Sequence, residues 1–265
     1  MINRFIIYFF IMSFIGYIYE CIAMIIWTGK WDNRGFLYGP IIPIYGAGAL
    51  IGTIVFNYFL TDASYLQVFL IGMIGSAILE YIVHYELEKI FNAYWWDYSK
   101  SPLNINGRIC LPASIGFGIA ALIIIYLINP ILLPIINKPN QLFIDILAII
   151  LIIICTIDFT LTISALSNLI NRVEAIEEYI DNHMEDILSY ITNEDKGINT
   201  KFYNSFDKLE EKEKIIKDRL DKLGSSMSGF YKNVLYNVKG FRGKNSKRLN
   251  YLLDRVKQRI TRSKQ

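Results

Sequence analysis

Charged side chains are scarce in the first 165 residues of this 265-residue chain. That stretch contains 7 Lys and Arg and 9 Asp and Glu, whereas residues 166–265 contain 20 and 15. A water-soluble globular fold spreads charges over its whole surface, and charged residues make up roughly 25% of an average soluble protein. The scarcity excludes such a fold for the first part of the chain. It indicates a change of solvent near residue 165, from lipid to water.

Cysteine and histidine are also rare. The three cysteines are Cys21, Cys110 and Cys155, and each lies in or beside an apolar run. They form neither a disulfide framework nor a paired metal-ligand spacing, so we interpret them as small apolar helix residues. Two carboxylates and a histidine inside the apolar part could bind a metal, but nothing in their spacing demands it. We therefore expect no metal and no cofactor.

Several sequence motifs of enzymes are missing. The chain has no GxxxxGK[ST] phosphate loop, which excludes ATP hydrolysis by that route. No Ser or Cys nucleophile with a paired base is recognisable. We therefore expect a protein that is not an enzyme, and we keep a membrane-embedded activity on a lipid headgroup as the least favoured alternative. The N-terminus has no basic region followed by a cleavage site, so the first apolar run is expected to remain as a span.

What the chain does have is long apolar runs. A helix crossing the hydrocarbon core needs about 20 mostly apolar residues. Five stretches qualify: residues 5–27, 36–60, 65–87, 109–133 and 142–168. The predicted fold is thus all-α, a polytopic membrane bundle over residues 1–168. The run from Asn129 to Pro139 holds three prolines and predicts the end of the fourth span and a turn.

The second of these stretches is unusual in its composition. Proline inside a helix removes a backbone hydrogen bond and clashes with the preceding turn. We therefore predict a broken or kinked span, which is tolerated only where protein or a water-filled cavity covers it. The residues of this broken-helix motif are Gly39, Pro40, Pro43, Gly46 and Gly48.

Basic residues in short loops predict the orientation. Cytoplasmic loops carry the excess of Lys and Arg. Lys30 and Arg34 follow the first span, and Lys89, Lys100 and Arg108 follow the third. These loops and the charged tail then lie in the cytoplasm of a bacterial cell, with the N-terminus outside the inner membrane.

The tail is predicted to be helical and water-exposed. Residues 169–238 contain two heptad-like apolar seams separated by a turn at about 192–204, which is typical of a coiled coil. The hairpin either packs on itself, forms a homo-oligomer or binds a soluble partner. Residues 239–265 carry ten Lys and Arg against Asp254 alone, with an apolar stripe at helical spacing. Next to a membrane this pattern favours binding to anionic lipid headgroups over binding to nucleic acid.

Ionisable residues inside the predicted spans are candidates for function, because they are costly in lipid. Glu20 and Glu80 lie at similar depths in two spans that run in the same direction, and His84 is one turn beyond Glu80. These three residues are expected to face a polar cavity in the cytoplasmic half. The alternative is an interfacial position or a structural hydrogen bond. Glu86 and Glu88 follow at the membrane edge, where water can solvate them.

Two loops carry the most distinctive motifs. Residues 33–40 read Asn-Arg-Gly-Phe-Leu-Tyr-Gly-Pro, residues 95–99 read Trp-Trp-Asp-Tyr-Ser, and residues 104–111 read Asn-Ile-Asn-Gly-Arg-Ile-Cys-Leu. With Gly16-Tyr17 and Leu79-Glu80-Tyr81, they make residues 5–135 resemble the bacterial family of putative ABC-transporter type IV permeases. This resemblance implies the membrane component of a transporter whose ATPase is a separate chain.

The motifs also have a physical interpretation. The cytoplasmic mouth of the cavity is expected to be lined by Arg34, Asp97, Asn106 and Arg108. These polar side chains can satisfy one another through charge-assisted hydrogen bonds. The rings of Trp95, Trp96 and Tyr98 are of the kind found at the membrane–water interface. The first functional hypothesis is a permease with a cytoplasm-facing polar site. The alternative is a membrane-anchored scaffold or sensor whose tail recruits a soluble partner.

Overall fold

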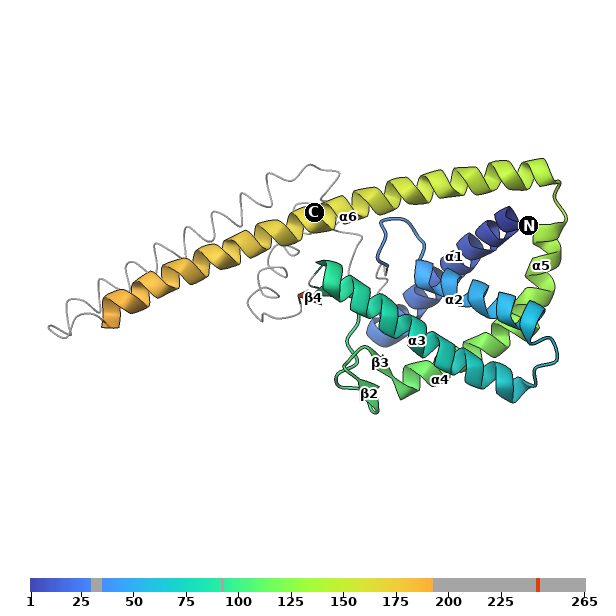
Figure 1. The fold of residues 1–265 in the computed structure, drawn as a ribbon, viewed down its shortest axis with the longest axis horizontal. Coiled ribbons are helices and arrows are strands. Elements are labelled where there is room, and N and C mark those ends of the chain that lie inside the picture. Colours follow the sequence, from blue (N-terminus) through green and yellow to red (C-terminus); the bar gives the residue numbers. More distant parts are fainter. Residues whose placement is uncertain (30–34, 92, 193–241, 244–265) are drawn as a thin grey trace. The chain divides into compact units, whose positions relative to one another are not determined.

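The computed structural model describes residues 1–29, 35–91, 93–192 and 242–243 (Figure 1). Within this part, four helices are long and apolar enough to cross a membrane. Helix α1 spans Ile2–Thr28 and α3 spans Tyr65–Phe91. The other two crossings are Leu111–Asn137 and the first part of α6, Gln141–Asn168. The chain is thus a multi-pass, helical membrane protein, as predicted.

The second predicted span has a different form. Helix α2 covers Pro43–Ile54 and continues as a π-helical turn, η1, over Val55–Phe59. At 1.5 Å per residue this helix is about 25 Å long, which is less than the roughly 30 Å of hydrocarbon. The span predicted over 36–60 is thus broken, as its glycines and prolines indicated, and its first seven residues precede the helix. Helix α2 begins at Pro43, because an N–H in the first helical turn has no partner within the helix and its absence costs nothing there. Gly39 and Pro40 lie before this start.

Helix α2 begins halfway along α1. The backbone N–H of Ile42 donates to the carbonyl oxygen of Ser13, 3.1 Å away. From there α2 runs antiparallel to α1, and the rings of Tyr58 and Phe5 meet near the start of α1 with centroids 6.5 Å apart. The break in the second crossing is thus at mid-depth, and the non-helical residues 35–42 lie between it and the end of α1.

A compact loop follows α3 and contains three of the four short strands of the described chain. Strand β2 (Asn104–Ile105) pairs antiparallel with β3 (Ile109–Cys110). Strand β1 (Ala93–Tyr94) pairs with β4 (Arg242–Gly243). Each strand has only two residues, so the predicted all-α class holds.

The fourth crossing is one continuous rod made of three parts. Helix α4 (Leu111–Ile123) passes into a π-helical turn, η2 (Ile124–Ile128), and then into α5 (Asn129–Asn137). Pro130 lacks the N–H that would bond to Tyr126, and this accounts for the wider turn at η2. The prediction that the span ends at residue 133 is wrong, because the helix continues through Pro134 to Asn137.

Helix α6 runs without interruption over Gln141–Thr192. The chain divides into two compact units, one of residues 1–162 with 237–244 and one of residues 163–236 with 245–265. The predicted passage of the last span directly into a further helix is therefore observed as far as Thr192. The seam after residue 192 and, apart from β4, the basic segment 239–265 lie outside the described residues.

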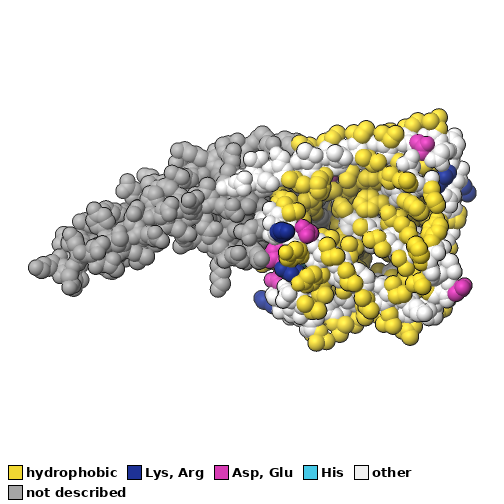
Figure 2. All heavy atoms as spheres, in the orientation of Figure 1, with side chains coloured by type: hydrophobic (Ala, Val, Ile, Leu, Met, Phe, Trp, Pro, Cys, Tyr) yellow, Lys and Arg dark blue, Asp and Glu magenta, His cyan; other side chains and the backbone are white. Residues whose placement is uncertain are grey.

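The outward faces of the crossings are apolar, as a lipid environment requires. Isoleucines on α3 such as Ile74, Ile78 and Ile82 are more than half exposed. Figure 2 shows how hydrophobic side chains cover most of the described surface on the face in view. The interior core, centred on Tyr8, Ala49, Ile144 and Ala148, is formed by α1, α2 and α6 with residues of α5.

A ring of three polar side chains lies beside this core. The hydroxyl of Tyr8 donates to Asn129 Oδ1 at 2.7 Å and lies 2.8 Å from Thr53 Oγ1, and Asn129 Nδ2 donates to Thr53 Oγ1 at 2.9 Å. All three side chains are buried. Each can donate and accept once within the ring, so no polar group is left unpaired in the hydrocarbon. The ring therefore joins α1, α2 and α5 at a fixed register.

Replacing Thr53 by Val should test this ring. The change keeps the side-chain shape but leaves Asn129 Nδ2 buried without its acceptor, a loss of about 1–3 kcal/mol in the free energy of unfolding. Thermal unfolding of the protein in detergent measures it. Thr160→Val is the matched control, because that exposed hydroxyl bonds only to its own helix at Thr156. Equal effects of the two substitutions would contradict the ring's role.

Candidate functional site

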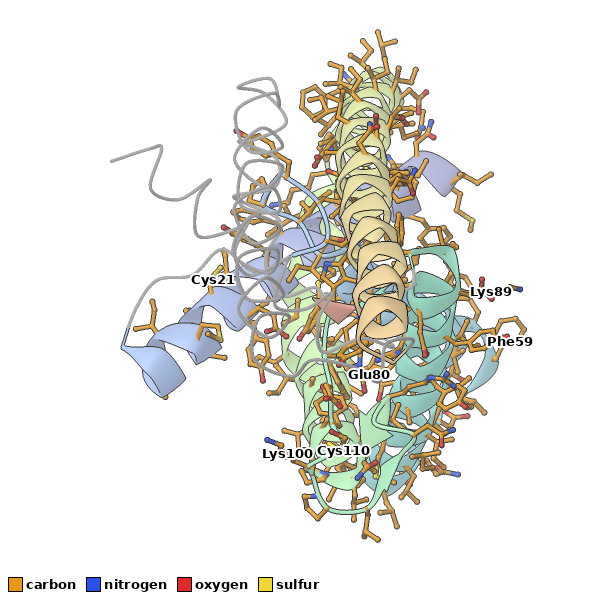
Figure 3. The ribbon with its side chains drawn as sticks, turned by 90° about the vertical axis from the view of Figure 1, so that its left-hand side faces the viewer. Cys21, Phe59, Glu80, Lys89, Lys100 and Cys110 are labelled. Atoms are coloured by element: carbon orange, nitrogen blue, oxygen red, sulfur yellow. The ribbon has the colours of Figure 1, made fainter. Side chains whose placement is uncertain are left out.

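Two carboxylates and two phenols from different parts of the chain meet at the level where α2 begins. The hydroxyl of Tyr45 on α2 donates to Glu20 Oε1 on α1. The hydroxyl of Tyr98, in the loop after α3, donates to Glu80 Oε1 on α3 at 3.4 Å. We call Glu20, Tyr45, Glu80 and Tyr98 the carboxylate cluster. Glu80 can be located in Figure 3.

The electrostatics of Tyr98 place both carboxylates near it. Burial is the main cause that raises the pKa of the Tyr98 phenol well above its usual value. The negative charges of Glu80 and, more weakly, Glu20 raise this pKa further. Tyr98 therefore stays protonated and remains a hydrogen-bond donor to the cluster.

Glycines position the cluster by letting α1 and α2 approach closely. A Cβ atom on Gly16 would lie 2.4 Å from the Tyr45 side chain, and one on Gly46 would lie 2.1 Å from Ser13 Oγ. Small residues at helix contacts in membranes allow this kind of backbone approach. Because Glu20 is one helical turn beyond Gly16, the contact brings the Tyr45 hydroxyl to its carboxylate.

The charges of Glu20 and Glu80 are not balanced by an ion pair within the described residues. Glu80 is 6% exposed, and its Oε2 atom is buried with no hydrogen-bond partner among them. The rings of Tyr19 and Phe117 flank Tyr45, with centroids 6.1 and 5.9 Å away. A buried carboxylate oxygen without a partner, with aromatic rings elsewhere in the cluster, suits a ligand that donates hydrogen bonds or carries positive charge.

Arg108 forms an ion pair with Glu88, which is outside the carboxylate cluster. Its Nε and Nη2 atoms donate to Glu88 Oε2 at 3.1 and 2.7 Å, and its Nη1 donates to the Tyr81 hydroxyl at 2.7 Å. The hydrogen bond to Glu88 is the main cause that raises the pKa of Arg108 above its usual value. Glu88 is 8% exposed, so it is not solvated as the sequence suggested. This pair fastens the loop to α3.

His84 belongs to the same fastening. His84 Nε2 lies 3.1 Å from the carbonyl oxygen of Trp96, and Nδ1 lies 3.7 Å from Glu88 Oε2. Trp96 Nε1 in turn donates to the carbonyl oxygen of Arg108 at 2.9 Å. Glu80, His84 and Glu88 form one buried stripe along α3, with Glu80 in the carboxylate cluster and the other two holding the loop.

The rest of the loop is shaped by a tight turn. Asn106 and Gly107 have φ angles of 53° and 69°, the left-handed conformation that an Asn-Gly hairpin turn requires. Asn106 Nδ2 donates to the Tyr81 hydroxyl at 3.2 Å, and Asp97 Oδ1 accepts the N–H of Ser99 at 2.9 Å. Trp95 is buried against Phe36 and Phe91. Of the residues predicted to line the cavity mouth, Arg34 lies outside the described residues.

The broken second crossing is capped by an acidic residue of α6. Asp158 Oδ1 accepts the backbone N–H of Tyr38 at 3.1 Å, and Oδ2 accepts that of Gly39 at 2.9 Å. Thr162 Oγ1 donates to Asp158 Oδ1 at 3.1 Å. A Cβ on residue 39 would be 2.9 Å from Asp158 Oδ2, so glycine gives the carboxylate room to reach the backbone.

Comparison with known families supports the resemblance noted from the motifs. The family model described as putative ABC-transporter type IV matches residues 7–163, more than half of the chain. The chain belongs to the putative ABC-transporter type IV family. No curated protein and no solved structure matches it.

The part of the chain that matches the type IV family contains the whole site. Glu20, Tyr45, Glu80, Tyr98 and Asp158 all lie within residues 7–163. The match ends at the boundary between the two compact units and does not include the charged tail. The family assignment and the apolar helices together identify the chain as a membrane transporter component.

Sequence reasoning missed three members of this site. Tyr45 and Tyr98 were not paired with the two glutamates, because tyrosine is common in apolar spans and at membrane interfaces. Asp158 was not among the predicted site residues. Its role could have been predicted from two features together, a carboxylate inside one span and a Gly-Pro break in another. The break leaves backbone N–H groups unpaired in lipid, and such groups need an acceptor.

Proposed function

We propose that this type IV family member is the permease subunit of a transporter in the bacterial inner membrane, and that the carboxylate cluster is its polar substrate site, open to the cytoplasm in one state. The observation that carries the proposal is the break in the second crossing at mid-depth, close to the half-buried carboxylate of Glu20 and the buried carboxylate of Glu80. Discontinuous helices beside polar residues at the bilayer midplane are typical of transporter binding sites.

In this proposal a second subunit supplies the energy for transport. ATP hydrolysis is assigned to a separate ATPase chain, because the sequence has no phosphate loop. The permease itself is proposed to be non-catalytic. The family assignment supports this partner, and we propose the heptad-patterned residues 169–238, predicted from the sequence to be water-exposed, as its docking element.

Co-purification from native membranes tests for this second subunit. A tagged full-length chain is solubilised in mild detergent, and its partners are identified by mass spectrometry and assayed for ATP hydrolysis. The expected result is an ATPase recovered in near-stoichiometric amount. A partner without ATPase activity that is lost on deletion of residues 169–238 would instead support the alternative, a membrane-anchored scaffold or sensor.

The orientation is a separate prediction from the charges of the loops. Reporter fusions at residues 30 and 100 and at the C-terminus should report a cytoplasmic location, and fusions at residues 62 and 138 an external one. This pattern requires that residues 35–59 cross the membrane completely despite the short α2. If the C-terminal reporter is active only outside the cell, an odd number of crossings with an external N-terminus is wrong.

A further inference from the structure

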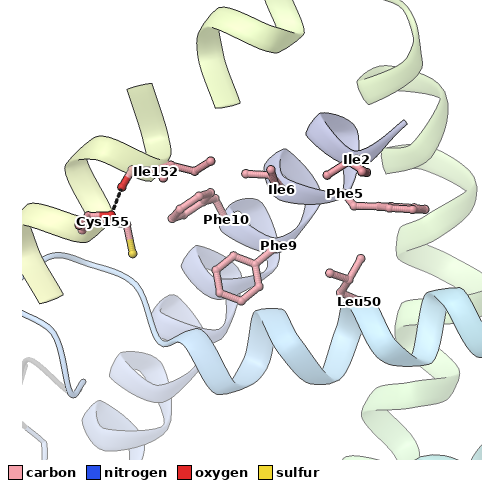
Figure 4. A pocket seen from close by; sticks show the side chains of 9 residues that line it. Ile2, Phe5, Ile6, Phe9, Phe10, Leu50, Ile152 and Cys155 are labelled. Atoms are coloured by element: carbon pink, nitrogen blue, oxygen red, sulfur yellow. Dashed lines mark hydrogen bonds between the residues drawn. The ribbon is translucent and has the colours of Figure 1, made fainter. Parts of the chain in front are cut away.

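An apolar groove lies between α1, α2 and α6, away from the carboxylate cluster. It has a volume of about 390 Å³, and Figure 4 shows its walls. Phe5, Ile6, Phe9 and Phe10 of α1 line one wall, Leu50 of α2 lies at the base, and Ile152 and Cys155 of α6 form the opposite wall.

The groove exists because α6 is fastened to the bundle on both sides of it. At one end Asn3 Nδ2 donates to Asp145 Oδ1 at 2.7 Å, and Ile144 and Ala148 pack into the core. At the other end Asp158 accepts the backbone N–H groups of Tyr38 and Gly39. Between these attachments the bundle-facing side of α6 leaves a space beside α1. The opening is thus held by specific contacts at two levels.

The groove offers almost no hydrogen-bonding partners for water. The Thr156 hydroxyl at its edge already donates to the carbonyl oxygen of Ile152 at 2.8 Å, and the remaining walls are apolar apart from the Cys155 thiol. A buried water needs two to four polar partners. An apolar ligand is therefore favoured over water throughout the groove.

The depth of the groove decides which apolar molecule is available. Its lining residues on α1 and α6 lie within the membrane-crossing parts of these helices, and Ile152 is 42% exposed. Lipid acyl chains surround a membrane protein at this depth. The volume lies at the low end of the roughly 300–1,000 Å³ of small-molecule pockets, which suits a single chain.

We propose that the groove between α1, α2 and α6 binds one acyl chain of a membrane lipid. The chain would complete the packing between α6 and α1 where the protein leaves it open. Because burial of each methylene group is favourable by about 0.8 kcal/mol relative to water but little relative to other lipid, the gain comes from contacts with the phenylalanine rings and from filling a void.

Photolabelling of the full-length protein tests this site. The protein is placed in nanodiscs of phosphatidylethanolamine and phosphatidylglycerol that contain a small fraction of phosphatidylethanolamine with a diazirine in its acyl chain. After irradiation, labelled positions are mapped by peptide mass spectrometry. Labelling at Phe9, Phe10 and Cys155 should exceed labelling at Ile78 and Ile82, which face lipid on α3 with exposed fractions of 56% and 52%.

Neighbouring residues of α2 provide a matched pair of variants. Leu50→Trp should fill the groove and reduce the labelling of Phe9 and Cys155 to the level found at the lipid-facing Ile78 and Ile82 or below it. Ile51→Trp changes a 53% exposed residue that does not line the groove, and it should leave labelling unchanged. Ile152→Trp blocks the opposite wall and replaces Leu50→Trp if that variant does not fold.

Three results would overturn the proposal. Equal labelling of the groove and of Ile78 and Ile82 would mean ordinary lipid solvation. Labelling that persists in both Leu50→Trp and Ile152→Trp would place the lipid elsewhere. A groove that stays unlabelled while Ile78 and Ile82 are labelled would mean that protein covers it, either another segment of this chain or a second copy.

Discussion

The Glu20→Gln, Glu80→Gln double variant should insert into the membrane, purify as a folded protein and fail to complement a deletion strain. Glutamine keeps the oxygen that accepts the hydroxyl of Tyr45 or Tyr98, and it removes only the charge. Because neither carboxylate has an ion-pair partner among the described residues, loss of the charge should not lower the thermal unfolding temperature. Growth complementation measures function, and thermal unfolding in detergent measures the fold of the same preparation.

Glu88→Gln is the matched control for this experiment. It makes the same chemical change two helical turns from Glu80, but it breaks the ion pair with Arg108. Removing one partner of a buried pair leaves the other charge unpaired, with a loss of about 3 kcal/mol. The control should therefore be less stable, whereas the double variant should be stable and inactive. Full complementation by the double variant would end the assignment of Glu20 and Glu80 as the working site.

The second large effect is expected at the contact of α1 and α2. Gly46→Ala should prevent normal folding, because the new Cβ would lie 2.1 Å from Ser13 Oγ and 2.4 Å from the carbonyl oxygen of Phe9. The backbone atom cannot move aside without separating the helices. Overpacking of this kind costs about 1–3 kcal/mol or more, and it would also move Tyr45 away from Glu20. Detergent-extracted yield and thermal unfolding measure the effect.

Gly52→Ala on the same helix is the comparison. A Cβ on residue 52 meets nothing within 4 Å, so alanine should be neutral or should stabilise the helix by up to about 1 kcal/mol. Two variants with the same loss of stability would indicate a general intolerance of α2 to side chains. In that case the close approach at Gly46 would not determine the helix contact.

The crossings were predictable from hydropathy because apolar length alone decides whether a helix can span lipid. The beginning of α2 was harder to place. Residues 36–42 are as apolar as the helix that follows, and hydropathy does not distinguish them. Pro40 and Pro43 predicted a break, but only the tertiary contacts of Ile42 with Ser13 and of Gly39 with Asp158 decide which side of it is helical.

The candidate site was predictable in part for a similar reason. The depth of Glu20 and Glu80 follows from their positions along two spans of the same direction, and the structure pairs each with a tyrosine, Glu20 with Tyr45 and Glu80 with Tyr98. The pairing of Arg108 did not follow from the sequence. The loop after α3 folds back at its Asn106-Gly107 turn, and this brings Arg108 to Glu88. The contact buries Glu88, which the sequence alone places at the membrane edge in water.

The cap on residues 38 and 39 has a consequence for how the protein is made. The carboxylate that accepts these two N–H groups lies about 120 residues later in the chain, on α6, the last membrane-crossing helix among the described residues. Until α6 is inserted, the non-helical segment before α2 lacks the protein acceptor that these N–H groups have in the folded bundle. The native form of the second crossing is therefore complete only when α6 is in place, so that this crossing matures last even if it enters the membrane early.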